Sequence, residues 1–413
     1  MRTPSRTAGL FCSLPVICIS ALCVRLAAMR LLHTWPMNET SELWKSGLEI
    51  INIATSLQAH RGFSSPFGAT TGPTAWIPPV YPYLVATIFR FLGPRSNQAA
   101  VAILTMQAFF SALTCIPIYR IGMRAFDERI AVWSTWGWAL FPSAVIIPVL
   151  FVWETAMSAF LMTFLVGLCL DLRRSRMPAR MLAGASWGLA ALTNTALLAA
   201  LPALLICPYT KKLAHLPAKA IATVLLVAVV LICPWIFRND RELGTIVPVR
   251  SNFGEELWVG NHEGGTGRIQ YGVGPSENRA EFERYRRLGE ISYVTQRRKE
   301  AITFIRGNRA LFFQQSFYRL RYWWFAEGET SSFFDCYRLL ALLSLVGIGF
   351  ALWKGMSNDV FAIAMTIALY PLIYYATNVY ARYRYPVEPL MMIFAAFAIS
   401  QTLALIQRRS RST

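Results

Sequence analysis

Charged residues are scarce in this chain, and acidic residues are the scarcest. Asp and Glu together number 22 among 413 residues, and all charged residues make up 15% of the chain. A soluble domain carries about 25% charged residues, so a soluble fold with a very large core is a poor explanation of this composition. Because acids are so few, the formal net charge at pH 7 is +18.

Motifs that would explain the positive charge through nucleic acid are also missing. The sequence has no zinc-finger, RNA-binding or Gly-rich nucleotide pattern, so we expect no nucleic-acid partner. The eight cysteines lie in or beside apolar runs and form no CxxC pair. They indicate small packing residues and not a disulfide framework or a metal site.

What the sequence does have is long apolar runs. Hydrophobic residues make up 55% of the chain. They fall into runs of about twenty residues separated by short basic stretches, which is the pattern of membrane helices. We expect an all-α polytopic membrane protein with about ten spans, the first of them an uncleaved helix. The expected spans are 9–31, 99–118, 130–150, 154–170, 181–194, 196–208, 218–237, 335–353, 359–378 and 387–406. The fifth and sixth alternatively form one tilted helix broken near Thr193 and Asn194.

Basic residues in the short loops indicate the orientation. With the N-terminus in the cytoplasm, every short basic loop falls on the cytoplasmic side, which favours two helices across 181–208. We therefore expect a bacterial inner (plasma) membrane protein with both termini cytoplasmic. The chain divides into a transmembrane core (1–237) that includes a first extracytoplasmic loop (33–98), a second extracytoplasmic loop (238–334) and C-terminal transmembrane helices (335–413).

Both long loops mix aromatic residues, Gly, Pro and charges, which predicts ordered structure at the membrane surface. The stretch 81–92 is apolar but too short to span, so we expect an interfacial helix there. Ser276 is expected to cap an amphipathic helix in the second loop. Residues 301–325 alternate aromatic and basic side chains, which predicts a belt against membrane lipids.

Two acidic residues beside the spans are candidates for chemistry. Glu49 shares a helical face with Glu39 and Glu42 in the first outer loop. A carboxylate there can take a proton from an acceptor hydroxyl or bind a divalent cation, and the alternative is a solvated helix face. Glu154 lies alone between two apolar runs, where it needs a partner, a cation or water. The alternative for Glu154 is an acid stabilised by a helix dipole.

Basic and polar residues supply further candidates. Arg382 and Arg384 alternate with tyrosines in a short outer loop, against the positive-inside rule. This placement favours binding of a phosphate, and the alternative is snorkelling to lipid headgroups. His262 lies in a polar, Gly-flanked turn and can bind a ligand, a metal or an acceptor, or be an ordinary loop residue. Without a second His or Cys at ligand spacing, the metal interpretation is weak.

The order of these segments resembles the GT-C glycosyltransferases, specifically the bacterial family 39-like enzymes related to protein mannosyltransferases and aminoarabinose transferases. The resemblance covers nearly the whole chain. The matching segments are 47–57 with 62–67, 72–82, 238–239, 248–254 with 257–262, and 382–389. The resemblance implies transfer of a sugar from a polyprenyl-phosphate carrier to an extracytoplasmic acceptor (lipid, glycan or protein), generally with inversion.

The resemblance also implies roles for individual residues. Glu49 matches the acidic base position best, and Glu154 falls where the family often supplies a second acid. The lipid phosphate would be held by basic residues, here Arg382, Arg384 and Arg238. Three residues of the matching loop segments are expected on the acceptor side, namely Tyr81, Asn261 and His262. The wider family has an Asp, often with a second acid close by, so Glu49 leaves open the need for a divalent cation (Mg²⁺ or Mn²⁺).

Two other classes of function compete with the enzyme. One is a non-catalytic transporter or flippase for lipid-linked glycans, and the other is an accessory membrane subunit that has lost catalysis. A flippase should line its membrane interior with charges, whereas the middles of these spans are nearly free of them. The long outer loops also favour the enzyme.

Overall fold

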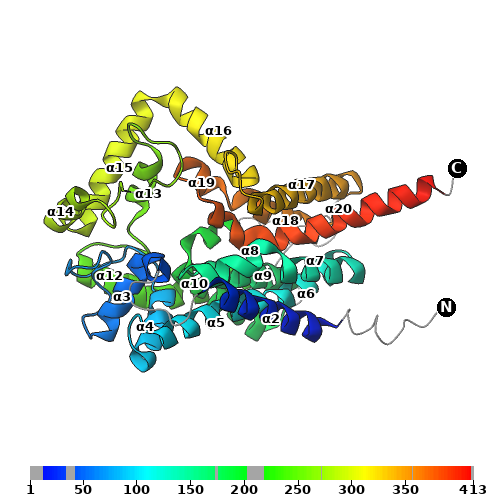
Figure 1. Ribbon diagram of the computed structural model, residues 1–413, viewed down its shortest axis with the longest axis horizontal. Helices are drawn as coiled ribbons and strands as arrows, with labels where there is room; N and C mark the ends of the chain where they lie inside the picture. The colour runs from blue at the N-terminus through cyan, green and yellow to red at the C-terminus, as the bar shows by residue number, and fades with distance from the viewer. Residues whose placement is uncertain are drawn as a thin grey trace.

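The computed structural model describes residues 13–33, 42–172, 175–201, 218–270, 272–355 and 357–410. These residues fold into helices without a strand, and two isolated bridges are the only β-type pairings among them. Figure 1 shows a bundle of long helices with shorter helices gathered at one end. α2 begins and α20 ends at the end of the bundle opposite α13, α14 and α15.

Long apolar helices build the bundle. They are α2 (Leu14–Leu32), α5 (Asn97–Leu113), α6 (Cys115–Ala125), α7 (Glu128–Leu140), α8 (Pro142–Leu150), α9 (Thr155–Asp171), α10 (Met177–Thr193), α12 (Ala218–Leu243), α17 (Phe333–Trp353), α18 (Asn358–Leu369), α19 (Leu372–Ala376) and α20 (Glu388–Arg409). The short 3-10 helices η3 (Thr195–Ala200) and η4 (Ala381–Val387) join α10 and α20 to the rest.

Six stretches of described helix are long and apolar enough to cross a bilayer. They are Leu14–Leu32, Asn97–Ala125, Lys219–Leu243, Phe333–Trp353, Asn358–Ala376 and Ala381–Arg409. The pair α7 and α8, bent by 41°, makes a seventh if it counts as one span. The chain is therefore an integral membrane protein.

This count is lower than the ten expected spans. Helices α9 and α10 stand at two of the expected places, but each has only 17 residues, at the short limit for a crossing. Most of the expected span 196–208 lies outside the described residues.

The bend between α7 and α8 is stabilised by a buried arginine. Arg25 of α2 is fully buried and donates to the carbonyl oxygens of Ala139 (3.0 Å) and Trp138 (3.2 Å). These carbonyls lie in the last turn of α7, where a helix leaves its carbonyl groups without their usual donors four residues on. The carbonyl of Trp138 also accepts from the backbone N–H of Phe141 at 3.4 Å. Arg25 also donates to Ser111 of α5 (2.8 Å). The bend directs α8 toward the segment that carries Glu154.

Three turns that the sequence predicts to lie on the same side of the membrane are close together in the structure. Arg124 near the end of α6 is ion-paired with Asp171 at the end of α9 and with Asp359 at the start of α18 (2.9 Å for Asp359). The ends of α6, α9 and α18 therefore lie together, as the predicted alternation of the chain requires.

Shorter helices form the two outer segments. The first contains η1 (Glu42–Lys45), α3 (Leu48–Gln58) and α4 (Val80–Leu92), and α4 occupies the stretch expected to be helical. The second contains α13 (Phe253–Gly260), α14 (Arg279–Leu288), α15 (Glu290–Gly307) and α16 (Arg309–Phe325). The expected cap of α14 is wrong. Asn278, not Ser276, accepts from the backbone N–H groups of Ala280 and Glu281, because α14 begins at Arg279 and Ser276 lies two residues before the cap position.

A buried carboxylate joins the two outer segments. Glu290, the first residue of α15, is 6% exposed and accepts hydrogen bonds from the backbone of Ala75 (2.8 Å) and the hydroxyl of Thr74. It also accepts from Ser251 (2.7 Å) and Tyr285 (2.9 Å). Several donors and the N-terminus of α15 stabilise the buried charge. The two segments are thereby fixed against each other beside the end of the bundle.

Candidate active site

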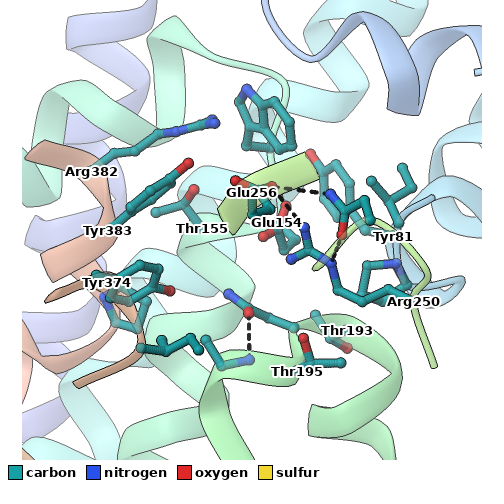
Figure 2. Close-up of a pocket in the computed structure, with 18 of the residues that line it drawn as sticks. Tyr81, Glu154, Thr155, Thr193, Thr195, Arg250, Glu256, Tyr374, Arg382 and Tyr383 are labelled. Atoms are coloured by element: carbon teal, nitrogen blue, oxygen red, sulfur yellow. Dashed lines mark hydrogen bonds and ion pairs between the residues drawn. The ribbon is translucent and has the colours of Figure 1, made fainter. Parts of the chain in front are cut away.

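A cavity of about 420 Å³ lies where the two outer segments meet the ends of the membrane helices. Its walls come from selected residues of segments that are far apart in the sequence, within 49–50, 76–82, 153–155, 193–199, 250–256 and 370–386. Figure 2 shows Arg382 and Arg250 entering from opposite sides, with Glu154 and Glu256 between them. The cavity thus combines carboxylates and guanidinium groups in a partly enclosed space.

Glu49 and Glu154 reach the same cavity because a glycine lets two backbones touch. Gly47 has φ +72° and precedes α3, and a Cβ at this position would collide with the carbonyl oxygen of Val152. Only glycine avoids both the strain of this conformation and the collision. Glu49 in the first turn of α3 and Glu154, which precedes α9, are therefore held on one wall.

The carboxylate of Glu49 accepts a hydrogen bond from a hydroxyl group. Ser276 donates to its Oε1 atom at 2.8 Å. Burial raises the pKa of Glu49. A backbone hydrogen bond, the bond from Ser276 and the positive charge of Arg382 lower it, and Glu256 raises it. A carboxylate with a raised pKa is a better proton acceptor near neutral pH than an ordinary surface glutamate.

The two arginines of the cavity differ in their partners. Arg250 donates to Asn252 (2.5 Å) and is ion-paired with Glu256 (2.9 Å), so its charge is already balanced. Arg382 makes no ion pair within the described residues. Its guanidinium lies over the ring of Trp153, 3.9 Å from the centroid, with Tyr380 and Tyr383 at 5.5 and 5.7 Å. Arg382 is therefore the cation of the cavity that is available to an anionic ligand.

Three buried polar atoms that belong to lining residues have no hydrogen-bond partner in the part of the chain that the structure describes. They are the hydroxyl of Tyr81, Oδ1 of Asn378 and Nε of Arg382. Tyr81 and Asn378 are each 1% exposed. Because buried polar groups in folded proteins nearly always have a partner, these atoms indicate a cavity built for a polar ligand or water.

A break in the helical path forms one wall of the cavity. α10 ends at Thr193, and Asn194 accepts from the backbone of Ala196 (3.0 Å) to begin η3. The sequence analysis allowed for a break at Thr193 and Asn194, and the structure places it there. Thr193, Asn194 and Thr195 all line the cavity.

Arg384 lies elsewhere. It is fully buried, donates from Nε to Glu388 (3.0 Å), and uses its other two nitrogens for the carbonyls of Trp324 (2.9 Å) and Tyr337 (3.0 Å). Glu388 in turn accepts from Ser143. Each nitrogen of this guanidinium has a protein partner, and Arg384 does not line the cavity.

Three more expected site residues lie outside the cavity wall. Arg238 donates to the carbonyls of Phe63 and Thr74 (2.6 Å each) and so holds the first outer segment. Asn261 is fully buried and accepts from Arg319 (3.0 Å). His262 stacks on Trp258, with ring centroids 4.3 Å apart. The structure therefore brings together Glu49, Glu154, Tyr81 and Arg382 out of the eight expected residues.

Sequence reasoning missed the polar group opposite Arg382. Glu256 accepts from Asn252 (3.0 Å) and Asn378 (2.8 Å) in addition to its pairing with Arg250. The only signal was the run of polar residues at 250–256, and nothing in it distinguishes Glu255 from Glu256.

The carboxylates do not build a metal site by themselves. Glu49, Glu154 and Glu256 line one cavity, yet no three His, Cys, Asp or Glu side chains in the described ranges lie close enough to hold one ion. Mg²⁺ is usually held by one or two protein carboxylates and several waters, so the divalent cation that the resemblance leaves open stays a prediction.

Comparisons with known proteins identify the fold. No protein-family model matches the chain, and no curated protein matches it in sequence. The oligosaccharyltransferase AglB from Archaeoglobus fulgidus, solved with an inhibitory peptide and a dolichol-phosphate, superposes with a TM-score of 0.58 at 14% identity. That match covers 97% of this chain and 52% of AglB. A second structure of the Archaeoglobus enzyme, with Zn and sulfate, has a TM-score of 0.54 at 17% identity over 95% of this chain and 50% of the enzyme.

A bacterial protein has the same fold. ArnT from Cupriavidus metallidurans, bound to undecaprenyl phosphate, superposes with a TM-score of 0.52 at 14% identity over 93% of this chain and 59% of ArnT. AglB and ArnT are both GT-C membrane glycosyltransferases. The chain therefore has the GT-C fold, as the sequence resemblance predicts, and it spans about half the length of the archaeal neighbours.

Proposed function

We propose that this chain is a glycosyltransferase that moves a sugar from a polyprenyl-phosphate donor to an extracytoplasmic acceptor, with inversion at the anomeric carbon. One observation carries the proposal. In a GT-C fold, the cavity at the end of the membrane bundle places two carboxylates beside an arginine that has no ion-pair partner within the described residues.

The neighbours support the choice of donor. AglB was solved with a dolichol-phosphate and ArnT with undecaprenyl phosphate, and both ligands are phosphates of long isoprenoid lipids. A lipid phosphate matches this cavity because its charge can meet Arg382 while its tail remains among apolar helices. The acceptor, which is a lipid, a glycan or a protein, would approach from the side of the outer segments.

The chemical step follows from the positions of Glu49 and Arg382. Glu49 takes the proton of the acceptor hydroxyl, whose oxygen forms a bond to the anomeric carbon. The bond from that carbon to the phosphate oxygen breaks, and the lipid phosphate leaves with the electron pair. Arg382 stabilises the negative charge of the leaving phosphate in a place where little water competes. A single displacement of this kind inverts the anomeric centre.

The remaining polar groups suit the sugar. The hydroxyl of Tyr81 and Oδ1 of Asn378 lack partners and can bind sugar hydroxyls, and Arg250 with Glu256 presents a donor and an acceptor side by side. Seven aromatic lining residues offer faces against which a sugar ring can pack: Trp76, Tyr81, Trp153, Phe253, Tyr370, Tyr374 and Tyr383. Glu154 is assigned to orienting the acceptor beside Glu49.

The same proposal assigns an orientation in the bacterial inner membrane. The start of α2 and the end of α20 lie at the end of the bundle opposite the outer segments (Figure 1). Arg124 and its partners, which the positive-inside rule assigns to the cytoplasm, lie at the meeting of α6, α9 and α18. With cytoplasmic termini, the cavity opens to the extracytoplasmic side.

A transfer assay tests the proposal. Purified full chain in lipid is given a panel of radiolabelled polyprenyl-phosphate sugars, with native membrane extract as the source of acceptor. We expect label to move from one donor to an acceptor. Absence of transfer from every donor, together with thermal stabilisation by the lipid phosphate alone, would overturn the enzyme and favour a transporter or an accessory subunit.

A further inference from the structure

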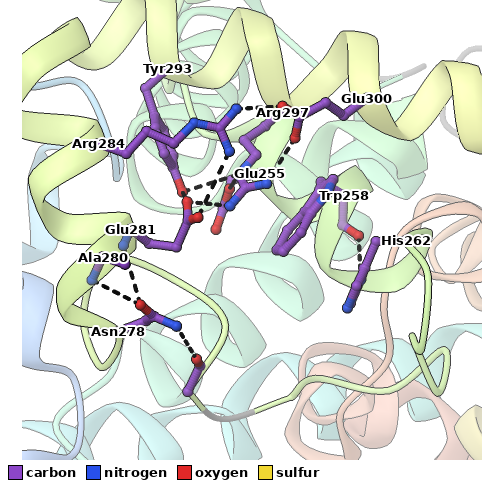
Figure 3. Close-up of polar contacts among 11 residues, drawn as sticks. Glu255, Trp258, His262, Asn278, Ala280, Glu281, Arg284, Tyr293, Arg297 and Glu300 are labelled. Atoms are coloured by element: carbon purple, nitrogen blue, oxygen red, sulfur yellow. Dashed lines mark hydrogen bonds and ion pairs between the residues drawn. The ribbon is translucent and has the colours of Figure 1, made fainter.

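The second outer segment contains a cluster of charged residues (Figure 3), and none of them lines the cavity. Arg297 of α15, 3% exposed, lies at its centre. Its guanidinium is ion-paired with Glu281 of α14 and with Glu300 of its own helix (2.8 Å). Its Nε atom lies 3.5 Å from a carboxylate oxygen of Glu255 in α13. One side chain thus contacts three helices.

Arg297 holds α13 through two residues that lie on one face of that helix. Besides Glu255, it contacts Trp258, whose ring centroid lies 3.5 Å from the guanidinium carbon. Residues three apart on a helix are neighbours on its surface. α13 also packs directly on α15, because a Cβ at Gly254 would collide with the carbonyl oxygen of Val294. The position and rotation of α13 are therefore fixed from the side of Arg297.

The next residue of α13 belongs to the cavity. Glu256 follows Glu255 directly and binds Arg250 (2.9 Å) and Asn378 (2.8 Å) on the cavity wall. Successive residues on a helix point about 100° apart, so these two acids face different surroundings. Any rotation of α13 that followed the loss of Arg297 would move Glu256 away from its partners.

Arg297 is also connected to Glu49, through the contacts of Glu281 and Ser276. Glu281, which Arg297 binds, lies in the first turn of α14 and also accepts from Tyr293 (3.0 Å). The segment that enters α14 carries Ser276, whose hydroxyl donates to Glu49 at 2.8 Å. Holding α14 in place therefore holds the hydroxyl that contacts Glu49.

We propose that Arg297 is a positioning residue that sets two acids of the cavity, Glu256 through α13 and Glu49 through α14 and Ser276. It lies outside the cavity wall and acts through these helices. The consequence for catalysis rests on the proposed function, whereas the positional effect on Glu49 does not.

The positional effect has a measurable signature in the pKa of Glu49. A backbone hydrogen bond and the bond from Ser276 lower that pKa against the rise caused by burial, and the charges of Arg382 and Glu256 act in opposite directions. Loss of Arg297 should let α14 shift and weaken the Ser276 bond, so the pKa of Glu49 should rise. The substitution Ser276→Ala removes the same bond directly and should raise it equally.

The test measures the pH at which Glu49 becomes protonated without using turnover. A hydrophobic carbodiimide reacts with protonated carboxyl groups and favours those in apolar surroundings, and peptide mass spectrometry follows the labelling of Glu49 in the full chain in lipid across pH. We expect Arg297→Gln and Ser276→Ala each to move the labelling midpoint up by about one pH unit. The double variant should move it by less than the sum of the two single shifts, because both changes act on the Ser276 bond.

The matched control is Arg298→Gln, an exposed arginine on the same helix, which should leave the midpoint unchanged. A midpoint that moves in Ser276→Ala but not in Arg297→Gln would overturn the proposal, as would fully additive shifts in the double variant. Should Arg297→Gln fail to fold, Glu281→Gln breaks only the α14 link and should give the same shift. An unchanged midpoint in Glu281→Gln would then overturn it.

Transfer measurements separate this proposal from the proposed function. In an active enzyme, Arg297→Gln should lower kcat and move the acid limb of the pH–rate profile upward, whereas Arg298→Gln should do neither. If no donor supports transfer by the wild type while the labelling midpoint still responds to Arg297, the enzyme assignment fails and the positioning role stands.

Discussion

Two arginines only two positions apart in the sequence have opposite surroundings in this protein. Each nitrogen of the Arg384 guanidinium binds Glu388 or a backbone carbonyl, and a serine binds the second oxygen of Glu388. Arg382 lies over Trp153 beside the cavity, and its Nε has no hydrogen-bond partner among the described residues. A buried charge whose hydrogen bonds are all made belongs to the fold, whereas one left incomplete next to open space indicates a ligand site.

The geometry of η4 explains why the two arginines separate. A 3-10 helix has three residues per turn, so side chains two positions apart point in clearly different directions. Arg382 faces the cavity, and Arg384 faces α16 and α17 through the carbonyls of Trp324 and Tyr337. Sequence alone gives both residues the same unusual position in an outer loop, so it assigned both to the phosphate.

Among the residues that line the cavity with Arg382, Glu49→Gln is expected to have the largest effect. Loss of a general base should lower the transfer rate by about 10²- to 10⁴-fold, with the donor affinity retained. Initial rates beside donor binding in lipid check this. A variant that turns over at the wild-type rate would remove Glu49 from the chemistry.

At the fully paired arginine, the substitution Arg384→Met should lower the stability of the fold. It leaves Glu388 buried without its partner, which costs about 3–5 kcal/mol of unfolding free energy. Thermal or denaturant unfolding in lipid measures the loss. The double variant Arg384→Met/Glu388→Leu should recover most of it, since removing both charges also removes the unpaired one. If the single variant is as stable as the wild type, Arg384 and Glu388 are not a buried pair that stabilises the fold.

The pH dependence gives a smaller but signed effect. Burial raises the pKa of Glu49, so the protonated form is favoured in the folded protein. The acid limb of kcat/KM should therefore lie above the ordinary pKa of a glutamate. The stability that comes from protonated Glu49 is present at low pH and lost as the pH rises through the raised pKa. Glu49→Gln should accordingly unfold at a higher temperature than the wild type at pH 8 but not at pH 4. The reverse order would contradict the raised pKa.

The smallest effect concerns the hydroxyl of Tyr81. Because this hydroxyl has no partner within the described residues, Tyr81→Phe should leave the unfolding temperature unchanged or slightly higher. If the hydroxyl binds the sugar, the same change should lower kcat/KM by roughly tenfold. Tyr83→Phe, at a more exposed position of the same helix, serves as the control. Equal rates in both variants would exclude Tyr81 from the sugar site.

Much of the fold was predictable because long apolar runs and short basic loops carry strong signals. The helices at 14–32, 218–243 and 333–353 stand close to their expected positions. The number of crossings was not predictable to the same degree. Apolar runs such as α9 are buried inside the bundle, and a sequence does not distinguish a short buried helix from a span.

The site was predictable only where a residue type was out of place in its sequence neighbourhood. Glu49, Glu154 and Arg382 attracted attention as charges beside apolar runs, and all three line the cavity. Glu256 gave no such signal, because its position depends on how α13 packs on α15 at Gly254. The roles of His262 and Asn261 remain predictions from the resemblance, and the structure places both outside the cavity wall.

The most direct test of the account is the binding of a polyprenyl phosphate by Arg382→Gln and by Arg384→Gln, measured side by side on folded protein. We predict that Arg382→Gln weakens binding by roughly 10- to 100-fold without changing the unfolding temperature. Arg384→Gln should lower the unfolding temperature and leave the affinity of the folded fraction unchanged. Normal affinity in Arg382→Gln, with weakened binding by fully stable Arg384→Gln, would contradict the placement of the lipid phosphate in this cavity.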